Sequence, residues 1–384
     1  MELKHGLHLA YCTNIHRGEN WEQTFTSLKR DVLAVRDRMA SGRAYAIGLR
    51  LSDVASRELS EPAVLDSFQQ WLTDENCYVF TINGFPYGNF HGTRVKEQVY
   101  RPDWTDPARL EYTNRLFDLI AQLVPAGVEG SVSTLPGSFK EFIQDESQEQ
   151  IIRRNLWSCA EHIAALSDRT GKPLHLGLEP EPLGYFETSA ETVRFFEQMA
   201  AEHPGDGILT EHLGVNYDTC HLAVEYEEPQ GALDALRSAG LKISKLHLSA
   251  AIMVKPDASV RERLAPFQED VYLHQVVERL TDGTLVRHRD LDVALASDNP
   301  AEEWRIHFHI PLHSPDGEWF GSTRDHIGGV LDVVQADPAL CTHLEMETYT
   351  WEVLPGQLKN REVVDQLVGE YDWTLKQLND RGLA

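Results

Sequence analysis

Short apolar segments alternate with longer amphipathic ones along almost the whole chain, and this alternation restricts the fold more than any other feature. Nine apolar segments have the length of β-strands, at 6–12, 44–52, 77–84, 130–137, 173–182, 212–218, 243–250, 304–312 and 342–349. Most are separated by segments with helical spacing of apolar residues, at 21–40, 113–124, 147–171 and 189–203. The last of these helices is expected to begin at Ser189. Alternating strands and helices predict a parallel sheet with right-handed crossovers.

Eight strand–helix units close into a barrel, so the sequence predicts an α/β fold of the (β/α)8 TIM-barrel type. The segment 304–312 is then one strand too many, and we assign it to a long insertion after the seventh strand, at roughly 250–340. An amphipathic pattern near 267–281 predicts a helix inside this insertion. The 384 residues would also suffice for two ordinary domains. Because no Pro-, Gly- or Ser-rich linker divides the chain, we expect one decorated barrel domain over residues 1–384.

The formal net charge of −25 restricts the partners of the chain, since 60 Asp and Glu face only 35 Lys and Arg. Nucleic acids and anionic membranes both attract clustered basic residues, so neither is expected as a partner. No apolar run reaches the roughly 18 residues of a membrane-spanning helix, and the first residues lack the apolar run of a signal peptide. We therefore expect a cytoplasmic protein with a small-molecule partner, either as a single chain or as a homo-oligomer.

The five cysteines are spread widely and form no CxxC pair; they are Cys12, Cys77, Cys159, Cys220 and Cys341. Neither a disulfide framework nor a zinc ribbon is indicated by this spacing. Each cysteine lies in an apolar stretch, which predicts buried thiols in a reducing compartment.

Ionisable residues gather at the ends of the predicted strands, where TIM barrels carry their chemistry. In chain order they are Glu179 and Glu181, Asp218 and His221, His247, His307 and His309, and Glu345 and Glu347. Members of the pairs two residues apart share one face of an extended strand. Several carboxylates at one barrel mouth repel each other, and a divalent cation relieves that repulsion. We predict a shared metal site made by Glu179, Asp218, His247 and Glu347, with Glu345 as the alternative to the last ligand.

The absence of thiolates from this set favours Zn²⁺, Mn²⁺, Fe²⁺ or Co²⁺ over Ca²⁺, which prefers oxygen ligands alone. Each of these residues, taken alone, also has a simpler interpretation than metal binding. A lone Glu at a strand end is commonly a helix cap, and a lone His on an apolar strand is commonly part of the core. The combination on four consecutive strands is what supports a metal site.

Four motifs, "LGLEPEP", "NYDTCH", "KLHLS" and "EMETY", in this order resemble those of the xylose isomerase-like TIM-barrel superfamily. That superfamily includes sugar isomerases, ketose 3-epimerases, inosose dehydratases and endonuclease IV-type repair enzymes. The resemblance covers nearly the whole barrel and is strongest at 173–250 and 342–349. It implies that the shared metal site of the superfamily falls on Glu179, Asp218, His247 and Glu347. As in the epimerases, Glu179 and Glu347 would also be the catalytic acid/base groups.

The endonuclease branch implies a further metal, held by His221 together with His307 and His309, where His replaces the Asp of that branch's Asp-x-His pair. A third metal of that branch needs histidines after strands three and four, where this chain ends its strands at Asn83 and Leu135. In the isomerase branch a catalytic lysine stands two residues after the first metal glutamate, and here that position is Glu181. The cofactor prediction is therefore a divalent metal, Zn²⁺ or Mn²⁺, at one site, with a second site implied by the endonuclease branch.

Longer stretches, "TINGFPYGNFHGTRVKEQVYRPDW", "LVRHRDL" and "HLEMETYTWEVLP", are similar to the EboE family of metabolite-traffic proteins. That family belongs to a bacterial gene cluster for a secondary-metabolite precursor, which implies proteins of the same biosynthetic cluster as partners. Four residues are candidates for substrate binding: His91, Glu181, Arg94 and Trp351.

Three functions remain open from the sequence. The first is a metal-dependent isomerase or epimerase of a small polyhydroxylated metabolite, such as a sugar, a cyclitol or a derivative, that acts through an enediolate. The second is a di-metal hydrolase of a phosphoester other than DNA, favoured by His221, His307 and His309. The third is a non-catalytic metal-binding component of a metabolite-traffic assembly. The number of bound metals would separate the first two.

Overall fold

The computed structural model describes residues 1–40, 42–88, 95–349 and 362–384. Its main sheet has eight strands in the spatial order β1, β13, β7, β6, β5, β4, β3, β2, and their pairings are parallel. The strands are β1 (His8–Tyr11), β2 (Tyr45–Arg50), β3 (Cys77–Asn83), β4 (Gly130–Thr134), β5 (Leu174–Leu178), β6 (Leu213–Asp218), β7 (Lys242–Leu248) and β13 (His343–Met346). Cys12 pairs with Gly48 between the two outer strands, which nearly closes the barrel. The predicted (β/α)8 fold is confirmed.

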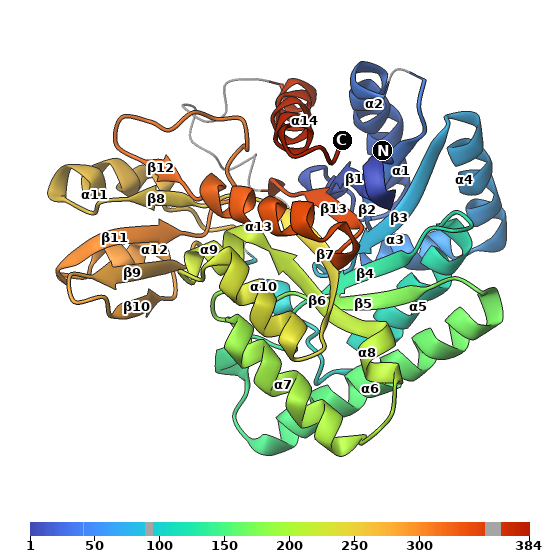
Figure 1. Cartoon of the computed structure of the whole chain (residues 1–384), viewed down its shortest axis with the longest axis horizontal. Coiled ribbons are helices and arrows are strands. Elements are labelled where there is room, and N and C mark those ends of the chain that lie inside the picture. Colours follow the sequence, from blue (N-terminus) through green and yellow to red (C-terminus); the bar gives the residue numbers. More distant parts are fainter. Residues whose placement is uncertain (41, 89–94, 350–361) are drawn as a thin grey trace.

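Helices surround the barrel and fill the connections between its strands (Figure 1). They are α1 (Trp21–Ser27), α2 (Leu33–Met39), α3 (Asp53–Leu59), α4 (Pro62–Asp74), α5 (Pro107–Leu123), α6 (Glu146–Thr170), α7 (Ser189–Glu202), α8 (Ile208–His212), α9 (Thr219–Val224), α10 (Pro229–Ser238), α13 (Arg324–Ala336) and α14 (Val363–Asp380). Helix α7 begins at Ser189, as predicted, and its cap is the preceding residue Thr188, whose side chain accepts from the Glu191 N–H.

The barrel strands are apolar because both of their faces are covered, by the helices outside and by the other strands inside. Every residue of β2, β4, β5 and β6 is buried. The largest fully buried side chains include Tyr45, Tyr112 and Phe117. All five cysteines are buried free thiols, as the sequence predicts. Apolar burial of this extent is the main term that stabilises such a fold.

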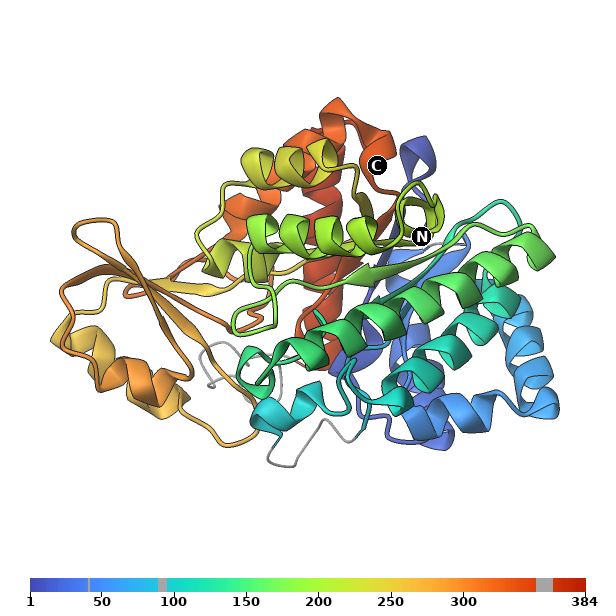
Figure 2. The same ribbon diagram turned by 90° about the horizontal axis from the view of Figure 1, so that it is seen from below.

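The insertion after β7 is a second sheet of five antiparallel strands, in the order β10, β9, β11, β8, β12. Its elements are β8 (Ile252–Val254), α11 (Ala258–Leu264), β9 (Val276–Leu280), β10 (Leu285–His288), α12 (Leu291–Leu295), β11 (Ala301–Ile306) and β12 (Gly321–Ser322). This sheet projects from one side of the barrel (Figure 1), and the view in Figure 2 shows the same projection. The helix predicted near 267–281 is wrong, because that segment holds a short 3-10 helix at Ala265–Phe267 and then β9.

Ion pairs join the insertion to the barrel. Arg287 on β10 pairs with Glu225, next to α9, and lies 3.4 Å from Glu187, which follows β5. From the 3-10 helix Lys96–Tyr100, Lys96 lies 2.6 Å from Asp290. These ion pairs hold the insertion against the loops that follow the barrel strands at their C-terminal ends.

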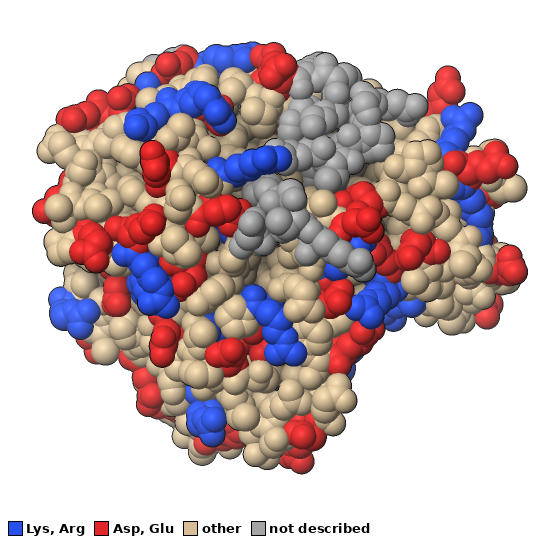
Figure 3. Space-filling model, turned by 180° about the vertical axis from the view of Figure 1, so that it is seen from behind, with Lys and Arg blue, Asp and Glu red and all other residues tan. Residues whose placement is uncertain are grey.

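No helix in the described ranges is both long and apolar enough to cross a membrane. On the face of the molecule shown in Figure 3, acidic side chains lie among the basic ones. Such a mixed surface is unlike the clustered basic face that nucleic-acid binding requires.

Candidate metal centre

Four side chains from four neighbouring strands converge at the C-terminal end of the barrel. Glu179 follows β5, Asp218 ends β6, His247 is the penultimate residue of β7, and Glu347 follows β13. Each offers one ligand atom, and these four atoms all lie within 4.8 Å of one another. All four residues are buried. The convergence that the sequence predicts is therefore present in the structure.

The imidazole of His247 is oriented so that one ring nitrogen faces the carboxylates. Its Nδ1 lies 3.1 Å from Glu179 Oε1, 3.5 Å from Asp218 Oδ2 and 3.3 Å from Glu347 Oε2. Burial disfavours the imidazolium, yet these carboxylates, with Glu347 foremost, raise the pKa of His247 well above its ordinary value. In the metal-free chain a proton on His247 thus serves as the counter-charge for the cluster.

The other ring nitrogen of His247 is held by a buried ion pair inside the barrel. Its Nε2 lies 2.8 Å from Glu345 Oε2, which also accepts from Lys245 Nζ at 2.6 Å. Burial opposes ionisation of Glu345, but Lys245 and His247 lower its pKa to about 2. Metal-ligating histidines commonly donate their second N–H to a carboxylate. Glu345 therefore has the position of an orienting group, and Glu347 that of the ligand.

One carboxylate oxygen of Asp218 faces the cluster, and the other accepts hydrogen bonds from nearby residues. Its Oδ1 accepts from the Cys220 N–H at 2.7 Å and from the Ser249 hydroxyl. Its Oδ2 is buried without a hydrogen bond and faces His247. Burial opposes ionisation, but His221, His247 and His309 hold the pKa of Asp218 well below its ordinary value. A buried anionic oxygen with no donor is the kind of group that a cation satisfies.

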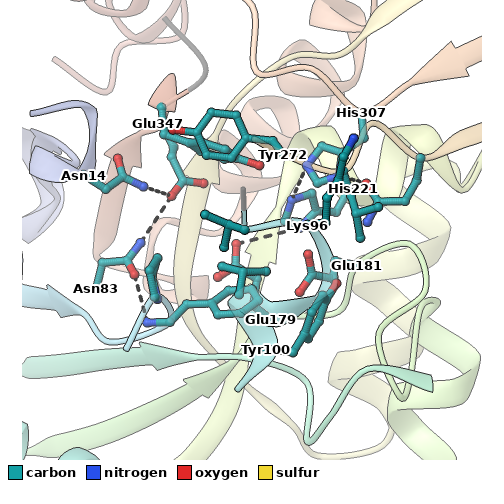
Figure 4. Close-up of a pocket in the computed structure, with 17 residues that line it drawn as sticks. Asn14, Asn83, Lys96, Tyr100, Glu179, Glu181, His221, Tyr272, His307 and Glu347 are labelled. Atoms are coloured by element: carbon teal, nitrogen blue, oxygen red, sulfur yellow. Dashed lines mark hydrogen bonds and ion pairs between the residues drawn. The ribbon is translucent and has the colours of Figure 1, made fainter. Parts of the chain in front are cut away.

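Two amide side chains that the sequence interpretation missed position Glu347. Asn14, which follows β1, donates to Glu347 Oε1 at 2.7 Å, and Asn83, at the end of β3, donates to the same oxygen at 3.2 Å. Figure 4 shows both amides pointing toward this carboxylate. Because asparagine carries no recognisable pattern in a single sequence, only their positions after strands one and three could have indicated this role.

Three histidines form a second group beside the first. The Nε2 atoms of His221, His307 and His309 lie 3.0 to 3.3 Å from one another. His307 Nδ1 lies 2.7 Å from Gln275 Oε1, and His309 Nδ1 lies 3.2 Å from the Glu347 carbonyl. His221 Nδ1 is buried without a hydrogen bond, 3.7 Å from Glu179 Oε1.

Burial, together with the neighbouring imidazoles, lowers the pKa of His307 well below its ordinary value, and burial lowers the pKa of His309. When all three rings are neutral and carry their N–H at Nδ1, their Nε2 lone pairs point toward one another, an arrangement that suits a metal. His307 and His309 follow β11 rather than lying on it, so the predicted alternation along a strand is wrong, although both rings reach the barrel mouth.

A cavity with an empty volume of about 580 Å³, including its opening to solvent, lies over these groups. Glu179, Glu181, His221, His307 and Glu347 are among its lining residues (Figure 4). Strand β5 ends at Leu178, so Glu181 lies beyond the strand and the predicted two-residue period does not apply to it. Glu181 is nevertheless buried at the cavity, where burial and the neighbouring Glu179 raise its pKa well above its ordinary value.

Three of the four predicted substrate-binding residues belong to segments that the structure does not describe. His91, Arg94 and Trp351 fall outside the described residues. Residues that the sequence interpretation did not single out as cavity walls include Tyr100 and Tyr272, and Gln275 from the insertion is a further one. Gly84 and Leu135 directly follow β3 and β4.

Solved structures with the same architecture match the chain over nearly its full length. The fold is that of the xylose isomerase-like TIM barrels. An L-ribulose 3-epimerase matches with a TM-score of 0.53 and 13% identity over 100% of this chain and 96% of its own. The IolI protein with a bound zinc atom has a TM-score of 0.53 and 11% identity, with 97% and 98% coverage. A D-tagatose 3-epimerase-like protein has a TM-score of 0.51 and 12% identity, also with 97% and 98% coverage.

Neither a protein-family profile nor a curated protein sequence matches this chain. The likeness is therefore one of fold, and the side chains of this chain must carry the functional argument. Those side chains fit a divalent cation, because three carboxylates and an oriented imidazole converge around buried oxygens such as Asp218 Oδ2.

Proposed function

We propose that the protein is a divalent-metal-dependent isomerase or epimerase of a small polyhydroxylated molecule, such as a sugar, a cyclitol or a derivative. The observation that carries the proposal is the convergence of ligand atoms of Glu179, Asp218, His247 and Glu347 within 4.8 Å of one another, next to a cavity that opens to solvent. The epimerase fold of the structural neighbours supports it. The metal we expect is Zn²⁺ or Mn²⁺, held by these four residues.

A bound ion would supply Lewis-acid stabilisation of charge that develops on two adjacent substrate oxygens. The acid/base work then belongs to the carboxylates of the chain. Glu179 and Glu347 come from β5 and β13, which are separated in the barrel by β6 and β7. A substrate carbon held between them could lose its proton to one carboxylate and regain a proton from the other, which interconverts two epimers through an enediolate.

The surrounding residues keep these carboxylates in place. Asn14 and Asn83 hold one oxygen of Glu347, so that its other oxygen faces His247. Glu181 occupies the position of the isomerase lysine, and its raised pKa allows its protonated carboxyl to donate a hydrogen bond to a substrate oxygen. Because the catalytic lysine of the isomerases is absent here, the proposed mechanism uses proton transfer by carboxylates instead.

The three-histidine group favours a second candidate function. A di-metal hydrolase of a phosphoester uses two neighbouring ions, and His221, His307 and His309 could hold the second of them. The EboE-like stretches of sequence keep a third candidate open, a non-catalytic metal-binding component of a secondary-metabolite assembly. Such a component would need metal binding but no turnover.

Metal analysis combined with a substrate panel tests the proposal. Protein purified without chelator should retain a divalent metal, and the metal-loaded protein should interconvert at least one member of a panel of ketoses, cyclitols and their derivatives. Glu179→Gln and Glu347→Gln should each lower kcat by about 10²-fold or more. Glu111→Gln, at an exposed position of α5, is the matched control. Absence of metal, or turnover of phosphoesters alone, would contradict the isomerase assignment.

A further inference from the structure

The cavity above the metal centre has a polar floor and apolar walls. The floor consists of the carboxylates and imidazoles described above. The walls come from three separate segments and consist mainly of Phe85, Val95, Val99, Tyr272, Leu273 and Tyr349. Figure 4 shows the ring of Tyr272 lying across the cavity from Glu179 and Tyr100. A ligand that fills this space must satisfy both kinds of surface.

The apolar walls are held in place by packing and by backbone hydrogen bonds. The rings of Tyr272 and Tyr349 meet edge to face with centroids 5.5 Å apart. The Val95 and Lys96 N–H groups both donate to the Val271 carbonyl, at 3.0 and 2.8 Å. The segment after β3 and the insertion are thereby joined along the cavity, so the walls are preformed rather than assembled by the ligand.

The described residues that line the cavity offer little charge to a phosphate or another anion. Lys96 is the only Lys or Arg among the described residues that line it. Its Nζ is engaged by Asp290 Oδ2 at 2.6 Å and by the Glu269 carbonyl at 2.7 Å. The charge of Lys96 is thus already compensated, and its methylene chain is the part left to extend the apolar wall. Phosphate groups are normally bound by available Arg, Lys or backbone N–H groups.

We propose that the substrate presents two adjacent oxygens to the metal centre and an uncharged alkyl or aromatic group to the walls, and that it carries no phosphate. This inference rests on the proposed metal-dependent function. It narrows the proposed substrates, which are sugars, cyclitols and their derivatives, to derivatives that carry an apolar group and no phosphate. The apolar group would pack against Val99, Leu273 and Tyr272 and leave water. Its burial would supply the binding energy that a plain sugar gains from hydrogen bonds.

Hydroxamic acids test this class directly, because each one chelates a metal through two adjacent oxygens and differs only in the attached group. Zinc content is measured first, and calorimetry on the zinc-loaded protein then compares acetohydroxamate, benzohydroxamate and phosphoglycolohydroxamate. Benzohydroxamate should bind about tenfold or more tightly than acetohydroxamate, as expected for burial of a phenyl group. Phosphoglycolohydroxamate should bind no more tightly than acetohydroxamate.

A wall variant shows whether the phenyl group occupies the proposed position. Val99→Asn should reduce the ratio between the benzohydroxamate and acetohydroxamate affinities about threefold or more and leave acetohydroxamate binding unchanged. Val54→Asn introduces the same change at a side chain that is 50% exposed, and it should leave the ratio unchanged.

Two outcomes overturn the inference alone: zinc is retained and the affinities of the first two probes are equal, or the phosphate-bearing probe binds most tightly. If the protein retains no zinc and binds no hydroxamate, the proposed metal-dependent function fails, and the inference fails with it.

Discussion

His247 Nε2 lies 2.8 Å from Glu345 Oε2, and this contact sets which nitrogen of the imidazole faces the candidate metal centre. Because Glu345 is ionised through its pair with Lys245, it requires a proton on Nε2. When His247 is neutral, its Nδ1 lone pair is then directed at Glu179, Asp218 and Glu347. The barrel interior thus determines which nitrogen of His247 faces the carboxylates and would bind a metal there.

Replacing Glu345 by glutamine should weaken metal binding without removing a ligand. The amide lacks the charge that holds the Nε2 proton and can also present its NH₂ group to the ring. Metal affinity should fall about 10- to 100-fold, the usual effect of losing an outer-shell partner of a ligating histidine. Competition titration with a chromophoric chelator measures the change, and far-UV circular dichroism monitors folding.

The single substitution leaves the Lys245 ammonium buried without its partner, which can destabilise the fold by several kcal/mol. The double variant Lys245→Met, Glu345→Gln removes both charges and should restore stability while metal affinity stays low. Glu111→Gln serves as the surface control. Wild-type metal affinity in a folded double variant would show that Glu345 does not orient His247.

Substitution of His307 tests whether the three histidines hold a second ion. If the wild type binds two ions per chain, as the second candidate function requires, His307→Asn should lower the metal content to one, because one of three converging Nε2 atoms is lost while the four-residue centre keeps its ligands. Elemental analysis of protein loaded with Zn²⁺ and then desalted provides the count. His5→Asn, at an exposed position with a φ of 59°, is a matched control because asparagine tolerates that conformation. If the wild-type protein binds one ion per chain, the two-metal arrangement is wrong.

The barrel and the convergence of Glu179, Asp218, His247 and Glu347 could be predicted because they follow from local patterns. Parallel strands covered on both faces appear as short apolar runs, and the residues that follow those runs meet at one end of the barrel. Glu179, Asp218 and Glu347 are each found at such a position. The same rule does not distinguish Glu345 from Glu347. That distinction depends on Lys245, which lies inside the barrel and is paired with Glu345.

The insertion was harder to predict because its strands are short and mixed in polarity. Strand β9 has the sequence VVERL, and its last two residues are only half-buried, so it resembles part of an amphipathic helix. Its strand character depends on pairing with β10 and β11, which no local pattern encodes. Gln275 and the convergence of His307 with His221 depend on how this sheet packs on the barrel.

Gly48 leaves the space that Glu345 occupies. A Cβ at this position would lie 2.6 Å from the Tyr11 carbonyl and would overlap with Glu345 Oε1. Because the carbonyl belongs to the neighbouring strand and cannot move freely, Gly48→Ala should destabilise the protein by about 1–3 kcal/mol, as overpacking does. It should also weaken metal binding by displacing Glu345. Urea unfolding and the chelator titration measure the two effects.

Gly88→Ala is the matched control for this prediction, since a Cβ there meets no atom of the described residues within 4 Å. If Gly48→Ala has the stability of the wild type, the barrel interior is more adaptable around Glu345 than the close contacts indicate. If stability falls and metal affinity does not, Gly48 serves the fold without affecting the metal centre.

Glu370, on α14, should make the protein less stable in alkaline solution. It is buried and accepts hydrogen bonds from Thr348 at 2.6 Å and from the Leu312 N–H at 3.2 Å. Burial raises its pKa from 4.5 to about 7, although the hydrogen bonds oppose this effect. The folded chain thus binds this proton more tightly than the unfolded chain. The corresponding stability is fully present below about pH 4.5 and is lost as the pH rises through 7.

Glu370→Gln should remove this dependence. The amide keeps an oxygen for the same donors and carries no ionisable proton. The stability of the variant relative to the wild type should therefore increase by about 2–3 kcal/mol between pH 5 and pH 8, because each tenfold difference in proton affinity between the folded and unfolded chains corresponds to about 1.4 kcal/mol. Urea unfolding at several pH values gives the difference curve, and Glu111→Gln at the exposed surface should give a flat one. A Glu370→Gln curve that is flat, or that falls toward alkaline pH, would mean that Glu370 is ionised in the folded protein at neutral pH and that its hydrogen bonds outweigh its burial.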